Sequence, residues 1–234
     1  MYYGLGFLDP TYILVLIGAV LCLWASARVK TTFAKYAKIK SRSGITGRDA
    51  AERILNNAGI YDVSIQHVAG DLTDHYDPRN KTLNLSDATF GKDSVAAIGV
   101  AAHECGHAIQ HATGYAPLTF RSAFVPIANF GSMAAWPLII IGFFINGNTS
   151  SLLINLGILA FSLSVLFQLV TLPVEFNASK RAIGVLGDSG ILVAEEVDGT
   201  KKVLSAAALT YVASAAASIL QLLRIILISG RRND

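Results

Sequence analysis

Two histidines and a glutamate are spaced so that they could hold a metal ion and activate a water molecule on it. They lie in the run His103-Glu104-Cys105-Gly106-His107, inside an apolar, alanine-rich stretch. Residues four apart on an α-helix differ by about 40° in azimuth and about 6 Å in rise, so both imidazoles face one point. The H-E-x-x-H pattern predicts a zinc ion held by His103 and His107, with Glu104 as the base that deprotonates the zinc-bound water.

The composition predicts that much of the chain lies in lipid. Hydrophobic residues make up 53% of the 234 residues and charged residues only 15%, whereas a soluble domain carries about 25% charged residues. Four apolar stretches approach or reach the length of about 20 residues that crosses a bilayer: 12–27, 124–145, 152–174 and 203–228. Arg224 interrupts the fourth, which therefore either spans the membrane or lies against it. Pro126 and Pro137 predict kinks in the second.

Two observations exclude other classes of protein. The net charge is +3 and no long basic run is present, so nucleic-acid binding is not expected. Cys22 and Cys105 lie in different contexts without C-x-x-C spacing, so neither a disulfide scaffold nor a cysteine-based zinc site is expected.

The positive charges predict how the chain crosses the membrane. Twelve of the nineteen lysines and arginines lie in 28–121, and four more lie between the third and fourth apolar stretches. None precedes the first stretch or lies in the turn 146–150. Since cytoplasmic loops carry the excess of positive charge, both charged segments should face the cytoplasm and can build one site. Arg231 and Arg232 would lie outside under four spans, against the rule.

The segment 29–121 is long enough for a small extramembrane α+β unit. Thr46 with Asp49 predicts the start of a helix and Gly59 its end. Alternating residues predict strands over 62–68 and 81–86, with a turn at 77–80 between them and a helix from 93 or 94 to 112 after them. The predicted organisation begins with an N-terminal anchor (1–28) and a cytoplasmic zinc-peptidase region (29–121). A transmembrane hairpin (122–173) and a cytoplasmic segment that contains a third zinc ligand (174–203) follow. The chain ends in a C-terminal transmembrane or membrane-associated helix with its tail (204–234).

A catalytic zinc site needs a third protein ligand and an open position. Glu175 ranks first, because it begins the segment that leaves the third apolar stretch on the same side of the membrane as the histidines. Other carboxylates and histidines stay open as alternatives: Asp71, Asp74, His75, Asp77, Asp87, Asp93, His111, Asp188, Glu195, Glu196 and Asp198.

Four motifs carry a resemblance to a known family. They are Asp74-His-Tyr-Asp-Pro78, Ala101-Ala-His-Glu-x-Gly-His-Ala-x-Gln110, Pro173-Val-Glu-Phe-x-Ala-Ser179 and Ala206-Ala-Ala-Leu-Thr-Tyr-Val212. Together they resemble the YugP-type neutral zinc metallopeptidases of bacteria, which are related to the HtpX-like membrane gluzincins. The resemblance covers nearly the whole chain. It implies a multi-pass protein of the bacterial cytoplasmic membrane that binds one Zn²⁺ through His103, His107 and Glu175, uses Glu104 as general base and cleaves peptide or membrane-protein substrates.

One position departs from the HtpX-like pattern, which has an aspartate four residues after the third ligand. Here that position is Ser179, whose hydroxyl could still hydrogen-bond a ligating imidazole, although more weakly than a carboxylate. The gluzincin resemblance also suggests that strand 81–86 is a sheet edge that pairs with an extended substrate.

These residues leave three functions open. The first is a zinc endopeptidase at the cytoplasmic membrane face. The second is a site-2-type intramembrane protease, in which Asp188 of Leu186-Gly-Asp-Ser-Gly190 would replace Glu175 as ligand. The third is a non-catalytic membrane scaffold with a structural zinc. The sequence does not identify the physiological substrate, the oligomeric state or the oxyanion-stabilising side chain.

Overall fold

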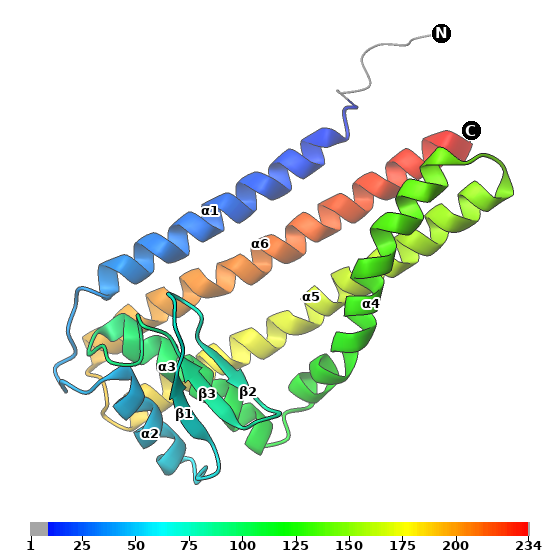
Figure 1. Cartoon of the computed structure of the whole chain (residues 1–234). Coiled ribbons are helices and arrows are strands. Elements are labelled where there is room, and N and C mark those ends of the chain that lie inside the picture. The colour runs from blue at the N-terminus through cyan, green and yellow to red at the C-terminus, as the bar shows by residue number, and fades with distance from the viewer. Residues whose placement is uncertain (1–8, 234) are drawn as a thin grey trace. The chain divides into compact units, whose positions relative to one another are not determined.

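The computed structural model describes residues 9–233 and is mainly helical (Figure 1). Its elements follow in the order α1 Tyr12–Tyr36, α2 Gly47–Asn57, β1 Ser64–His67, β2 His75–Asp77, β3 Thr82–Leu85, α3 Val95–Ala112, α4 Ala116–Phe144, α5 Asn148–Asp188 and α6 Ala194–Asn233. The described chain divides into two compact units. The first, which we call the site unit, comprises 26–119 and 172–209, and the second, the helical unit, comprises the remaining described residues.

The site unit contains a three-stranded sheet with the order β1-β3-β2 (Figure 1). β1 runs parallel to β3, with Ser64 opposite Thr82, and β2 runs antiparallel to β3, with His75 opposite Asn84. The two predicted strands are thus confirmed, but β2 was missed because three residues are too short to show alternation. The prediction of an edge at 81–86 is wrong. β3 is paired on both sides, and β1 and β2 are the edges.

Helix α2 begins and ends as the sequence predicts. Thr46 and Asp49 form a capping box, in which each side chain accepts a hydrogen bond from the other residue's backbone N–H. Gly59 adopts a φ of +70°, a conformation that only glycine takes without strain. The buried face of α2 packs against α3, and α2 lies beside β1 (Figure 1).

Helix α3 is the centre of the site unit. The Ser94 side chain caps its N-terminus by accepting a hydrogen bond from the Ala97 N–H. Most of the helix is buried, and it shares one core with β3, α2, the C-terminal part of α5 and the start of α6. A helix that is apolar nearly all round is expected to be enclosed on every side, and a charged residue within it needs a functional or structural reason.

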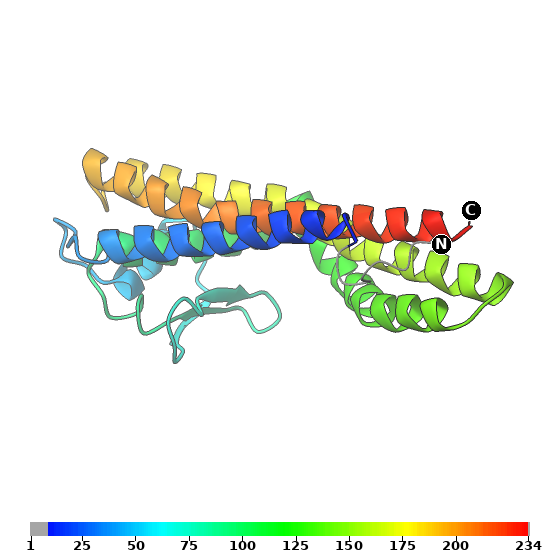
Figure 2. The ribbon, with the colours of Figure 1, turned by 90° about the horizontal axis from the view of Figure 1, so that it is seen from above.

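The four predicted apolar stretches all lie in helices that are long and apolar enough to cross a membrane: α1, α4, α5 and α6. Large apolar side chains on them are exposed, among them Phe130, Met133 and Phe144 at 74%, 78% and 82%, as expected of surfaces that face lipid. In the helical unit, α4 and the first part of α5 form a tight antiparallel hairpin (Figure 2). There Gly142 lies against Ile154, and the Ser150 hydroxyl donates a 2.7 Å hydrogen bond to the Gly142 carbonyl.

Candidate metal centre

Three donor atoms from two helices converge in the site unit. Among the described residues, one group of histidines, cysteines and carboxylates could hold a metal ion: His103 and His107 on α3 with Glu175 on α5. The Glu175 Oε2 atom lies 3.3 Å from His103 Nε2 and 3.5 Å from His107 Nε2. Ligands about 2.05 Å from a tetrahedral zinc ion are about 3.3 Å apart. The donor set and its spacing therefore fit zinc.

A glycine on α3 allows Glu175 to approach the histidines. A Cβ atom on Gly106 would lie 2.5 Å from the carbonyl oxygen of Ala178, closer than any normal contact. The two helix backbones therefore touch at the turn that carries the three donor groups. The ligand positions depend on this contact as well as on the spacing of the histidines along α3.

The centre is largely buried, and its charged groups act on one another. Glu175 is 3% exposed and His107 is 9% exposed. Burial alone would lower the pKa of His107, but its hydrogen bond to Glu175 and the charges of Glu104 and Glu175 outweigh burial, so the pKa is raised. Two carboxylates next to two imidazoles form a net anionic pocket when the imidazoles are neutral, which favours a divalent cation.

Glu104 follows His103 on α3 and is 8% exposed. A buried glutamate in a protein core is usually paired with a lysine or arginine. Within the part of the chain that the structure describes, no ion pair involves Glu104. The negative charge of its carboxylate contributes to the raised pKa of His107.

Both histidines have a partner on the nitrogen that faces away from Glu175. Ser179 Oγ lies 3.1 Å from His103 Nδ1, which confirms the prediction that this hydroxyl can hydrogen-bond one of the imidazoles. Gln110 Oε1 lies 3.1 Å from His107 Nδ1. This second partner was missed. The signal was present, because Gln110 is a polar residue one turn beyond His107 on an otherwise apolar helix face.

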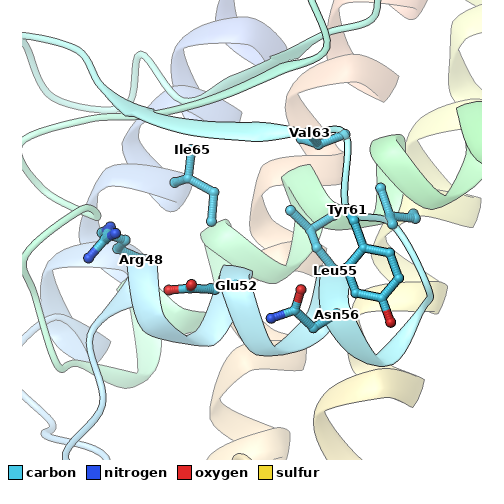
Figure 3. Close-up of a pocket in the computed structure, with 8 residues that line it drawn as sticks. Arg48, Glu52, Leu55, Asn56, Tyr61, Val63 and Ile65 are labelled. Atoms are coloured by element: carbon cyan, nitrogen blue, oxygen red, sulfur yellow. The ribbon is translucent and has the colours of Figure 1, made fainter.

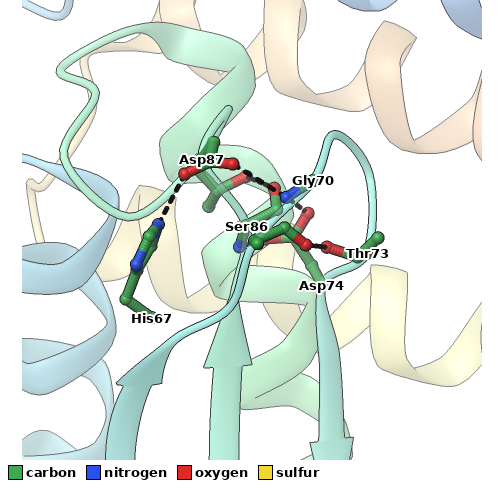
Figure 4. Close-up of polar contacts among 8 residues, drawn as sticks. His67, Gly70, Thr73, Asp74, Ser86 and Asp87 are labelled. Carbon is green, nitrogen blue, oxygen red and sulfur yellow. Dashed lines mark hydrogen bonds and ion pairs between the residues drawn. The ribbon is translucent and has the colours of Figure 1, made fainter.

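Seven of the alternative ligands are hydrogen-bonded to other groups. Asp74 accepts hydrogen bonds from the Ser86 N–H and hydroxyl, and Asp87 binds His67 and the Gly70 N–H, so that both hold the loop between β1 and β2 (Figure 4). Four further candidates have their own partners: Asp77 with Arg79 and Asn80, Asp93 with Lys40, His75 with Thr73 and Asn84, and His111 with the Tyr76 hydroxyl. Downstream, Glu196 accepts from the backbone N–H groups of Arg42 and Val193.

Two other features of the site unit lie apart from the metal centre. Burial raises the pKa of the Cys105 thiol, and its Sγ lies 3.7 Å from the Ala51 carbonyl, so it is an inert core residue. A pocket of about 220 Å³ lies between α2 and β1, lined by Glu52, Tyr61 and Ile65 among others (Figure 3). None of the candidate ligands contributes to it.

The fold and the centre define a class of protein: a chain with four candidate membrane helices that carries an H-E-x-x-H helix and, beside it, a carboxylate that could be the third metal ligand, in a small α+β unit. The chain belongs to the family described as "Putative neutral zinc metallopeptidase", whose model matches residues 11–230. It is 47% identical over 218 residues to the "Putative membrane protease YugP" of Bacillus subtilis (strain 168), covering 93% of this chain and 96% of that protein. The predicted family is confirmed. No solved structure matches the chain.

Proposed function

We propose that this protein is a membrane-embedded zinc endopeptidase in which His103, His107 and Glu175 bind one Zn²⁺ and Glu104 is the general base. The observation that carries the proposal is the convergence of two imidazole Nε2 atoms on one buried carboxylate oxygen, at 3.3 and 3.5 Å. Membership of a zinc metallopeptidase family supports the choice of metal and of reaction.

When bound, zinc would supply a Lewis acid that lowers the pKa of a water ligand toward about 7 and polarises a carbonyl. Glu104 accepts one proton from the attacking water as the C–O bond forms, and it delivers that proton to the amine nitrogen as the C–N bond breaks. The products are a carboxylate and an amine. The buried position of Glu104 keeps its carboxylate away from competing solvent.

Asp188 is the ligand that a site-2-type protease would use in place of Glu175. Asp188 is the last residue of α5, thirteen residues beyond Glu175, which corresponds to about 20 Å along a helix. The two carboxylates therefore cannot serve one ion. Glu175 is the ligand in the proposed site.

The test uses the full-length protein in detergent, with zinc content and cleavage of an unfolded protein substrate as readouts. Wild type should hold one zinc per chain. Glu104→Gln should keep the zinc and lose at least about 10²-fold in rate, Glu175→Ala should lose the zinc, and the control Asp188→Ala should change neither. Full activity in Glu104→Gln would contradict the proposed base, and a zinc-loaded wild type without any cleavage would indicate a scaffold.

We also propose that the site unit faces the cytoplasm. The support is the excess of lysine and arginine in its two segments and their absence from the turn between α4 and α5. In a Cys22→Ser background, Asn148→Cys should react with a membrane-impermeant maleimide in intact cells, whereas Ser43→Cys should react only after permeabilisation. The opposite labelling pattern would reverse the orientation.

For the substrate, we propose an extended peptide that adds to the free edge of β2. Of the two edge strands, β2 has the more extensive contact with α3, and the Tyr76 hydroxyl is hydrogen-bonded to His111 on that helix at 2.8 Å. An unpaired strand edge binds extended chains through its backbone groups. A photo-crosslinking residue at Asp77 in Glu104→Gln should capture a peptide substrate. Capture from Gln66 on β1 instead would refute this placement.

A further inference from the structure

Gln110 is fully buried on α3, one helical turn beyond His107, at 0% exposure. A side-chain amide has two N–H hydrogens and one carbonyl oxygen, and a buried one loses free energy for each group left without a partner. Both N–H hydrogens and the carbonyl oxygen of the Gln110 amide have partners, and these partners determine which way the amide points.

The nitrogen of Gln110 is fixed by α5. Gln110 Nε2 lies 2.8 Å from the Val174 carbonyl oxygen and 3.0 Å from Asn177 Oδ1. A backbone carbonyl can only accept, so the nitrogen and not the oxygen of Gln110 faces Val174. Asn177 Oδ1 is oriented in turn by Arg181, whose Nε donates to it at 2.8 Å. Since a guanidinium can only donate, neither amide can be reversed.

The oxygen of Gln110 must then face His107. Gln110 Oε1 lies 3.1 Å from His107 Nδ1, and because a carbonyl oxygen only accepts, Nδ1 has to carry the hydrogen. A neutral imidazole with its hydrogen on Nδ1 has its lone pair on Nε2. Nε2 is the atom of His107 that faces Glu175 Oε2.

We propose that Gln110 is a positioning residue that holds His107 in the Nδ1–H tautomer and so presents the Nε2 lone pair to the metal. The inference rests on the proposed zinc site and goes beyond it, because it assigns a role to a residue that touches neither metal nor substrate. Helix α5 thereby acts twice: it supplies the ligand Glu175 and, through Val174 and Asn177, orients the group that prepares His107.

His103 offers an internal comparison. Its Nδ1 partner is the Ser179 hydroxyl at 3.1 Å, and a hydroxyl can donate as well as accept. Ser179 therefore does not select a tautomer as strictly as an amide oxygen does. Loss of Gln110 should weaken zinc binding more than loss of Ser179.

The experiment measures zinc affinity by competition with a chromophoric chelator, using full-length protein in detergent. Gln110→Met removes the acceptor at similar volume and should weaken zinc binding about 10- to 100-fold. The matched control is Thr200→Val, which removes another buried hydrogen bond to α3, from Thr200 Oγ1 to the Val95 carbonyl, and should leave zinc affinity unchanged. If Gln110→Met does not fold, Asn177→Leu, which frees one amide hydrogen of Gln110, replaces it.

A second readout reports on Nδ1 itself in the zinc-loaded protein. The resonance of the His107 Nδ1–H should show a slowly exchanging, hydrogen-bonded hydrogen in wild type and in Thr200→Val, and a rapidly exchanging one in Gln110→Met. A purely structural role of Gln110 would lower the unfolding temperature without changing the exchange of this hydrogen. Wild-type zinc affinity and unchanged exchange in Gln110→Met would overturn the inference, whereas a wild type without zinc would overturn the proposed function instead.

Discussion

Gly106→Ala tests whether the contact between the α3 and α5 backbones sets the metal geometry. The new Cβ atom would lie 2.5 Å from the Ala178 carbonyl oxygen and 3.1 Å from its carbonyl carbon. A normal carbon–oxygen contact is about 3.3 Å, so the helices must separate by about 0.8 Å, and well-packed interiors do not absorb such a shift freely. Overpacking of this kind costs about 1–3 kcal/mol.

The consequence for zinc follows from where the separation occurs. Glu175 lies one turn before Ala178 on α5, so moving α5 away lengthens the Oε2–Nε2 separations of 3.3 and 3.5 Å. Metal–ligand distances tolerate only about 0.2 Å, so bound zinc prevents the strain from relaxing. If the full 1–3 kcal/mol opposes binding, zinc affinity should fall about 5- to 150-fold.

The assay compares zinc affinity and unfolding temperature in full-length protein. The control is Gly184→Ala on α5, since Gly184 is exposed and a Cβ there would contact nothing within 4 Å. That substitution should leave zinc affinity unchanged and slightly stabilise the helix. Zinc affinity equal to wild type in Gly106→Ala would refute the reasoning, because α3 and α5 would then not determine the site by their contact.

Three further outcomes are expected. Thr46→Ala should cost about 0.5–2 kcal/mol of unfolding free energy by removing the α2 cap, measured by chemical denaturation. The Thr46 hydrogen bonds lower the pKa of Asp49 below its ordinary 3.8, so the contribution of the capping box should be present above pH 3.8 and lost as pH falls through the lowered value, and a pH-independent loss in Thr46→Ala would contradict this. Zinc at about 100 times its dissociation constant should stabilise wild type by about 2.7 kcal/mol, seen as a higher unfolding temperature that Glu175→Ala abolishes; a shift retained in that variant would exclude Glu175. Cys105, at 0% exposure, should react with maleimide only on unfolding, and rapid labelling of the folded protein would show that the α3 core opens.

Local patterns in the sequence predicted the elements that depend on neighbouring residues. The capping box at Thr46 and Asp49, the helix stop at Gly59 and the helix through His103 and His107 rest on contacts within one turn, so spacing alone reveals them. The apolar stretches are equally visible, because crossing a bilayer requires length and hydrophobicity rather than particular partners.

Local patterns could not predict the order of the strands or the residues that hydrogen-bond the two histidines. Strand 81–86 was expected at an edge but lies between β1 and β2, since pairing depends on which strands meet in three dimensions. The role of Gln110 depends on Val174 and Asn177, more than sixty residues away.

The sequence by itself determined which reactive groups are available: two imidazoles and a carboxylate on one helix, in a chain with stretches apolar enough to cross a membrane. Only the tertiary structure decided that Glu175, rather than another carboxylate, meets those imidazoles. The physical reason is that a helix periodicity places residues four apart together without any other part of the chain, whereas Glu175 reaches His103 only because α5 packs against the bare backbone at Gly106.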